Sequence, residues 1–142
     1  MKLINIRVIV DPAGALEDNR LSGHLHMIDN NRLAGSQNQS TDHLSTAVSP
    51  GDRIVWSLQS IECEAYVALH SVNLPTDICD VQKNTYPGTN VSYWTATVKQ
   101  AVGDLPYGLV FEIGSRSRLI SNNDASRLID AIPSVVEVPG LV

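Results

Sequence analysis

The sequence of 142 residues is poor in several features that would decide its class at once. It has two cysteines, one phenylalanine and 5% aromatic residues, and its 10 basic residues are outnumbered by 15 acidic ones. A net charge of -5 without basic clusters argues against binding to the phosphate backbone of nucleic acids. No apolar run approaches the length of a membrane span. We therefore expect a globular protein without a nucleic-acid partner and without a membrane span.

The N-terminus lacks the marks of a secretory signal. MKLINIRVIVD alternates polar and apolar residues, without a purely apolar stretch or a small-residue cleavage site. This favours a cytoplasmic protein, or one released without a signal peptide. In that setting Cys63 and Cys79 fit reduced core residues better than a disulfide. A disulfide would need the strand that holds Cys63 to lie beside the loop that holds Cys79.

Motifs for catalysis and for organic cofactors are also missing. The sequence contains no G-x-S-x-G elbow, no Walker pattern and no G-x-G-x-x-G loop. SPGDRIVW at 49–56 has the turn and strand that precede the ligands in copper-binding sandwiches, with His70 placed as a first ligand. The closing run of Cys, His and Met that a blue-copper site needs does not follow. We therefore expect a protein that is not an enzyme and holds no organic cofactor.

Alternation of apolar and polar residues is the main positive signal. Period-two patterns rich in β-branched and aromatic residues, separated by Pro, Gly and Asn turns, predict short half-buried strands. Ile54, Trp56 and Leu58 should face the core after the turn at 50–52. The fold class predicted is all-β, a single antiparallel β-sandwich of Greek-key or jelly-roll type over residues 1–142. The expected strands are 3–10, 43–48, 53–58, 65–72, 91–98 and 107–113.

Two regions allow more specific predictions. Residues 24–29 and 32–36 flank Asn30-Asn31 and are expected to form a hairpin, followed by an exposed polar loop at 36–46. Near the C-terminus, 124–131 is the best helix candidate, with Asp124 as its cap. The alternative there is a hairpin of 117–121 and 126–130 around Asn122-Asn123.

Oxygen-rich turns carry the most suggestive chemistry. Carboxylate and amide oxygens can hold calcium or accept hydrogen bonds from sugar hydroxyls, and a sugar site would add an aromatic platform. Ordinary turn chemistry is the alternative for each of them. The candidate sugar-binding residues are Asn122, Asn123, Asp124, Trp94 and Tyr86, with Tyr93 and Tyr107 as further aromatics, and the turns 29–31 and 77–80 offer other oxygens.

A histidine pair gives a weaker prediction. His24 and His26 share one face of an expected strand and could hold zinc, with His43 as a third ligand. A solvated strand face is the alternative, because a two-ligand spacing carries little information.

Several stretches of the first half resemble the PixA/AidA-type bacterial inclusion body proteins. They are INIRVIVD, which ends in Asp11, then HLHMIDNN, and most specifically TDHLSTAVSPGDRIVWSLQSI. Within the last block the resemblance lies in Thr41-Asp42-x-Leu44, Gly51-Asp52 and Val55-Trp56. The second half matches only in its layout of strands.

The resemblance implies a compact β-sandwich without known enzymatic chemistry. Its members are associated with bacterial inclusions or with quorum-regulated expression, and a calcium-assisted lectin role is plausible for some. Asp11 and Asp29 match family positions, so we expect any calcium at Asp11, Asp29, Asn30 and Asn31. The function expected is lectin-like carbohydrate binding by a homodimer or higher homo-oligomer. The alternatives are a structural, inclusion-forming or host-interaction protein without a small-molecule ligand and, less favoured, a zinc-dependent enzyme.

Overall fold

The computed structural model describes residues 2–62, 65–89 and 91–132. The first half contains β1 (Leu3–Val10), α1 (Pro12–Asp18), β2 (Leu25–Asp29), the 3-10 turn η1 (Arg32–Ala34), β3 (Ser45–Val48) and β4 (Arg53–Ser60). The second half contains β5 (Val67–Asn73), β6 (Cys79–Thr85), β7 (Ser92–Val98), β8 (Asp104–Ile113) and β9 (Leu119–Asp130).

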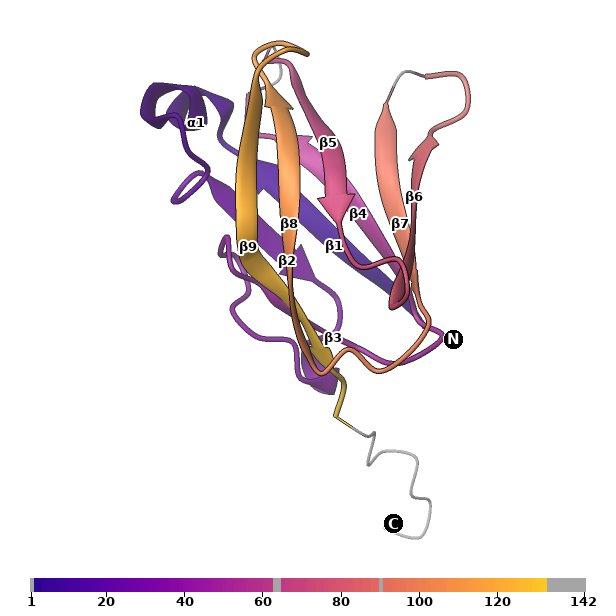
Figure 1. Ribbon diagram of the computed structural model, residues 1–142. Coiled ribbons are helices and arrows are strands. Elements are labelled where there is room, and N and C mark those ends of the chain that lie inside the picture. Colours follow the sequence, from indigo (N-terminus) through magenta and orange to yellow (C-terminus); the bar gives the residue numbers. More distant parts are fainter. Residues whose placement is uncertain (1, 63–64, 90, 133–142) are drawn as a thin grey trace, which may run out of the picture.

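The strands form two sheets that pack face to face (Figure 1). One sheet has the order β2-β1-β4-β7-β6, and the other has the order β3-β9-β8-β5. The predicted β-sandwich is therefore confirmed. Two neighbouring pairs, β1 with β4 and β3 with β9, are parallel, so both sheets are mixed where antiparallel sheets were expected. Parallel neighbours need a long connection, and the chain supplies one by passing from β1 through β2 and β3 before it returns as β4.

The core lies between the sheets, where the alternating patterns place it. Ile4, Ile6 and Val8 of β1 have no exposed surface. Trp56 is equally buried and meets Tyr107 of the opposite sheet edge-on, with ring centroids 5.9 Å apart. The Trp56 indole N–H donates to the Tyr107 hydroxyl at 3.2 Å, so this pair joins the two sheets through a hydrogen bond as well as through packing.

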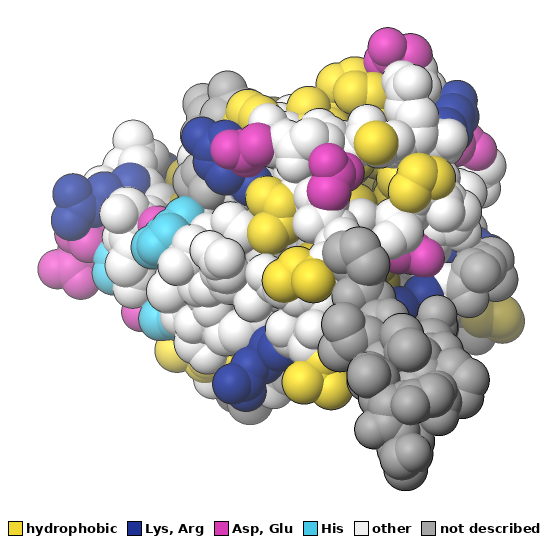
Figure 2. Space-filling model, turned by 90° about the horizontal axis from the view of Figure 1, so that it is seen from below, with side chains coloured by type: hydrophobic (Ala, Val, Ile, Leu, Met, Phe, Trp, Pro, Cys, Tyr) yellow, Lys and Arg dark blue, Asp and Glu magenta, His cyan; other side chains and the backbone are white. Residues whose placement is uncertain are grey.

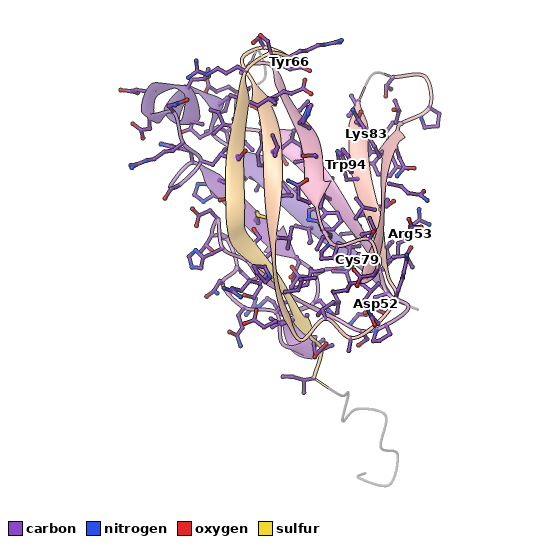
Figure 3. All side chains as sticks on the ribbon, viewed as in Figure 1. Asp52, Arg53, Tyr66, Cys79, Lys83 and Trp94 are labelled. Carbon is purple, nitrogen blue, oxygen red and sulfur yellow. The ribbon has the colours of Figure 1, made fainter. Side chains whose placement is uncertain are left out.

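The turn at 49–52 orients the strand that follows it. Gly51 has a φ of +93°, a conformation that other residues rarely adopt. The carboxylate of Asp52 accepts from the backbone N–H groups of Ser49 and Lys2, at 2.9 and 3.2 Å. Asp52 lies at the lower end of the sandwich in Figure 3. Ile54 and Trp56 are buried and Leu58 packs against the core, as predicted.

Two sequence-based predictions about local structure are wrong. Residues 119–130 form one strand, β9, and neither the helix at 124–131 nor the hairpin around Asn122-Asn123 occurs. Pairing with β8 along its length and with β3 at Ser45–Val48 outweighs the helical preference of DASRLIDA. The expected hairpin at 24–36 is replaced by β2 and the 3-10 turn η1, because Asn31 turns inward and is buried.

The helix α1 was not predicted, although the sequence carries its start signal. Asp11 caps it by accepting from the Gly14 N–H at 3.2 Å, and Pro12 occupies the first helical position. The chain leaves the helix through Asn19, whose φ is +52°. The helix therefore closes one end of the sandwich, next to β8.

The opposite end of the molecule is a mixed surface. Figure 2 shows hydrophobic, acidic and basic side chains interspersed with other side chains and backbone there. Within the described residues, the protein has no helix of the length and apolarity that a membrane crossing requires.

Candidate functional site: a cleft between the sheets

A cleft opens where the β6–β7 hairpin separates from β4. The β4–β7 ladder ends at the pair Trp56 and Trp94, although β4 continues to Ser60. The hairpin stays paired internally as far as Thr85 and Ser92, so its tip stands apart from β5 (Figure 1). The space between the hairpin and β5 is a cleft of about 690 Å³.

Polar side chains from both sheets line this cleft. Its hydroxyl groups include those of Ser60, Thr85 and Ser92, and its charged groups are Lys83, Glu112 and Arg116. Leu58 and Leu69 add apolar surface on the core side. The cleft therefore offers hydrogen-bond donors and acceptors beside apolar surface, which makes it more polar than most small-molecule sites.

Trp94 lies next to the cleft, in contact with one of its lining residues, Leu69. Its side chain is half-buried, and its indole N–H donates to the Leu69 carbonyl oxygen of β5 at 2.8 Å. It lies opposite Lys83 in the β6–β7 register, and both residues come from the hairpin side of the gap in Figure 3. This hydrogen bond ties the hairpin to the edge of the other sheet and keeps the two walls at a fixed separation.

Glu112 is held by two donors on the β5 side. The Tyr66 hydroxyl donates to Glu112 Oε1 at 2.7 Å, and His70 Nδ1 lies 3.0 Å from Oε2. A break in the β5–β8 register at His70 accompanies this contact. The hydrogen bonds from His70 and then Tyr66 lower the pKa of Glu112, and the nearby Lys83 charge adds to this effect. The same contact with Glu112 raises the pKa of Tyr66.

The rim of the cleft carries an aromatic ring. Tyr86 is exposed, lines the cleft, and packs on Tyr93 with ring centroids 4.5 Å apart. Tyr86 also borders a second hollow of about 520 Å³, which includes Asn5, Arg7 and Asn30. Tyr86 therefore borders both hollows.

The structure brings together only part of the predicted sugar site. Tyr86 lines the cleft, and Trp94 is bonded to the lining residue Leu69 without lining the cleft itself. Asn122 is buried on β9, which β8 separates from β5, and its amide donates to the Asp42 carbonyl at 3.1 Å. Asn123 and Asp124 belong to the same strand, and their side chains lie outside the described part of the structure. Tyr107, the other aromatic considered, is fully buried.

The predicted calcium residues of the 29–31 turn are mostly engaged by protein groups. Asp29 Oδ1 accepts from the Asn31 N–H and from Gln39 Nε2, at 2.9 and 3.0 Å. The Asn31 amide donates to the Ala47 carbonyl at 2.6 Å, and its oxygen accepts from Lys2 Nζ. Asp29 Oδ2 is buried and has no partner among the described residues. The Asn30 side-chain oxygen accepts from the backbone N–H of β1 residue 5 at 3.0 Å.

Asp11 lies apart from that turn. Asp11 directly follows Val10, which pairs with Leu25 at one end of the β1–β2 ladder. Asp29 pairs with Ile6 at the other end of that ladder. The described residues contain no group of three or more His, Cys, Asp or Glu that could hold a metal ion.

The three predicted zinc ligands have separate partners. His24 lies between two carboxylates, with Nε2 2.6 Å from Asp18 and Nδ1 3.4 Å from Asp11. His26 Nδ1 lies 3.2 Å from the Ser40 carbonyl, and His43 pairs with its neighbour Asp42. The hydrogen bond to Asp18 raises the pKa of His24, and Asp11 contributes a smaller part. His24 therefore secures α1 against the start of β2.

Sequence reasoning missed the residues that define the cleft. Tyr66, Lys83 and Glu112 come from three strand regions that are distant in the chain. The alternation in 65–72 does place Tyr66 and His70 on one strand face. The position of Glu112 beside that face could not be predicted, because it depends on the β5–β8 register.

Comparison with solved structures places the fold among the PixA-type inclusion body proteins. The crystal structure of an inclusion body protein, PixA, from Burkholderia cenocepacia J2315 superposes with a TM-score of 0.64. The match covers 93% of this chain and 96% of that chain at 10% sequence identity. The predicted resemblance is thus confirmed for the fold, and at this identity the match establishes the fold alone.

The sequence itself defines the family. The family described as a domain of unknown function, DUF8788, matches residues 2–118, and this chain belongs to it. A search of the curated proteins finds no match.

Proposed function

We propose that this chain is a non-enzymatic binding protein whose cleft recognises a carbohydrate. The observation that carries the proposal is the combination, in one cleft, of the Tyr86 ring with Lys83, Glu112 and hydroxyl groups. A sugar offers an apolar ring face for an aromatic side chain and hydroxyl groups that both donate and accept hydrogen bonds.

The state of Glu112 supports binding over catalysis. Its pKa is lowered by His70 and Tyr66, so the group stays ionised and acts only as an acceptor. A carboxyl that works as a general acid near neutral pH needs the opposite shift. Glu112 is therefore suited to accept a hydrogen bond from a ligand hydroxyl.

A glycan array with the full chain tests the proposal. Two arms, one with calcium and one with EDTA, test the predicted calcium assistance. The support for it is Asp29 Oδ2, a buried carboxylate oxygen without a hydrogen-bond partner among the described residues. Bound sugars are then titrated by calorimetry. Absence of binding in both arms would contradict the carbohydrate proposal.

Variants connect the binding to the cleft. Tyr86→Ala should weaken binding at least about tenfold, or about 1.4 kcal/mol, and Glu112→Gln should weaken it by about 1.5–3 kcal/mol because a charged acceptor is lost. Leu33→Ala and Glu17→Gln are matched controls, since both residues are exposed and lie outside the cleft. Equal effects of control and cleft variants would place the sugar elsewhere.

A second candidate function is inclusion formation in the cytoplasm by self-association. The supporting observation is the fold shared with a protein named as an inclusion body protein. Electron microscopy of cells that express the chain should show dense, regular particles if this is its role. Dispersed protein at high expression would count against it.

A further inference from the structure

The two sheets have four edge strands, β2 and β6 in one and β3 and β5 in the other. An uncovered edge presents backbone N–H and C=O groups that can pair with another chain. The four edges differ in how the protein covers them.

The chain covers the edges of β2 and β3 with its own segment 36–41. The Met27 N–H of β2 donates to the Thr41 carbonyl at 3.0 Å, and the Ser40 N–H returns a bond to Met27 at 2.8 Å. Ser45 of β3 exchanges two bonds with Gln37, both at 2.9 Å. These edges are closed to pairing.

The edge of β5 faces the β6–β7 hairpin across the cleft. Its Leu69 carbonyl accepts from the Trp94 indole. A strand from outside would have to displace the hairpin to pair with β5.

The edge of β6 is open. Two backbone bonds at the ends of β6 show which of its residues bond to β7. The Lys99 N–H donates to the Ile78 carbonyl at 2.8 Å, and the Tyr86 N–H donates to the Val91 carbonyl at 2.9 Å. Because bonding alternates in an antiparallel pair, the backbone groups of Val81 and Lys83 point away from β7. Within the described residues, no chain segment bonds to these outward groups, and β6 is the outermost strand in Figure 1.

We propose that β6 is the dimer interface, where it pairs antiparallel with β6 of a second copy about a two-fold axis at Gln82. This register places all seven residues of Cys79–Thr85 opposite residues of the partner, with the Cys79 N–H already donated to the Pro75 carbonyl. It also places the outward backbone groups of Val81 opposite those of Lys83 in the partner, so that N–H and C=O groups meet. The five-stranded sheet of each copy then joins that of its partner in one continuous sheet.

The side chains of this register are complementary. Asp80 faces Asn84 of the second copy, Lys83 faces Val81, and Gln82 faces Gln82 across the axis. No like charges lie opposite one another, which favours the pairing. A register centred on Lys83 would instead bring two lysines together.

Analytical ultracentrifugation of the full chain, without sugar or added metal, tests the interface. Wild-type protein should dimerise at micromolar concentration. Gln82→Lys and Gln82→Glu each place like charges on the axis and should weaken dimerisation at least about tenfold. Because residue 82 is exposed, both variants should keep the fold by circular dichroism. An equimolar mixture of the two should recover the dimer as a heterodimer.

Gln100→Lys is the matched control, because it adds the same charge at an exposed residue after β7 and should dimerise as the wild type does. A monomeric wild type would overturn the proposal. A dimer that Gln82→Lys leaves unchanged, or a mixture of the two variants that stays monomeric, would also overturn it. None of these outcomes depends on whether the cleft binds sugar.

Discussion

Trp94 of one sheet donates its indole N–H to the Leu69 carbonyl of the other at 2.8 Å. This bond lies next to the cleft, between two walls that share no strand pairing. The Trp94 side chain therefore adds a direct link between the walls to the core packing that holds the two sheets together.

Trp94→Phe should lower the free energy of unfolding by about 1–3 kcal/mol, because it removes the donor to Leu69 and part of the packing. Urea unfolding followed by circular dichroism measures this. Tyr93→Phe is the control and should change stability by less than about 0.5 kcal/mol. Equal stability of the two variants would show that the bond contributes little.

Glu112→Gln should change how stability depends on pH. The pKa of Glu112 is lower in the folded state than its ordinary value of 4.5, so its contribution is complete above that value. It is lost as the pH falls through the folded pKa. The stability difference between wild type and variant should therefore shrink as the pH falls from about 6 to about 3. A constant difference in urea unfolding would contradict this, and Glu17→Gln serves as the control.

The imidazole of His24 should titrate above its ordinary value of 6.5, because Asp18 favours the protonated form. Its contribution to stability is complete below 6.5 and is lost as the pH rises through the folded pKa. NMR titration of the ring protons gives this pKa directly. Asp18→Asn should lower it, whereas Asp42→Asn, which touches His43 instead, should leave it unchanged. No response to Asp18→Asn would exclude the pair as the cause.

Gly14→Ala should disturb the same histidine by a steric route. A Cβ at residue 14 would lie 2.3 Å from His24 Nδ1 and 2.5 Å from Asp11 Oδ2, so the imidazole must move. The pKa of His24 in the same NMR titration should then fall toward 6.5, although no charge has changed. An unaltered pKa would show that the ring keeps its partners after the substitution.

Cys79 should be inert in the folded protein. It is buried on β6, and burial raises the pKa of its thiol to about 11. Since the thiolate is the reactive form, Cys63→Ser protein should react with a thiol reagent at pH about 8 only when urea unfolds it. Rapid reaction of the folded variant would contradict the buried position.

The strands that face the core could be predicted from the sequence. The remaining elements depend on how the strands pair with one another. Residues 3–10 and 53–58 have an apolar residue at every second position, and both are core strands of the structure. β6, with the sequence CDVQKNT, is not among the predicted strands, because an edge strand buries little and its polar residues hide the alternation. For α1, the signals at Asp11 and Pro12 were present and were not used.

The candidate site was less accessible to sequence reasoning than the fold. Tyr86 and Trp94 were selected as aromatics, and they do lie at the cleft. Asn122 was selected for its oxygen, but its amide is used inside the fold to hold the segment at Asp42. A polar residue in an apolar stretch can serve the backbone or a ligand, and only its burial distinguishes these roles.

The segment 36–41 has a consequence for the size of any assembly. It covers the edges of β2 and β3, and the β6–β7 hairpin faces the edge of β5. Among the described strands, β6 alone is therefore left for backbone pairing between copies. A contact between identical edges about a two-fold axis is complete after one partner has joined. Strand pairing would therefore end at the dimer, and any larger particle would have to grow through side-chain contacts between dimers.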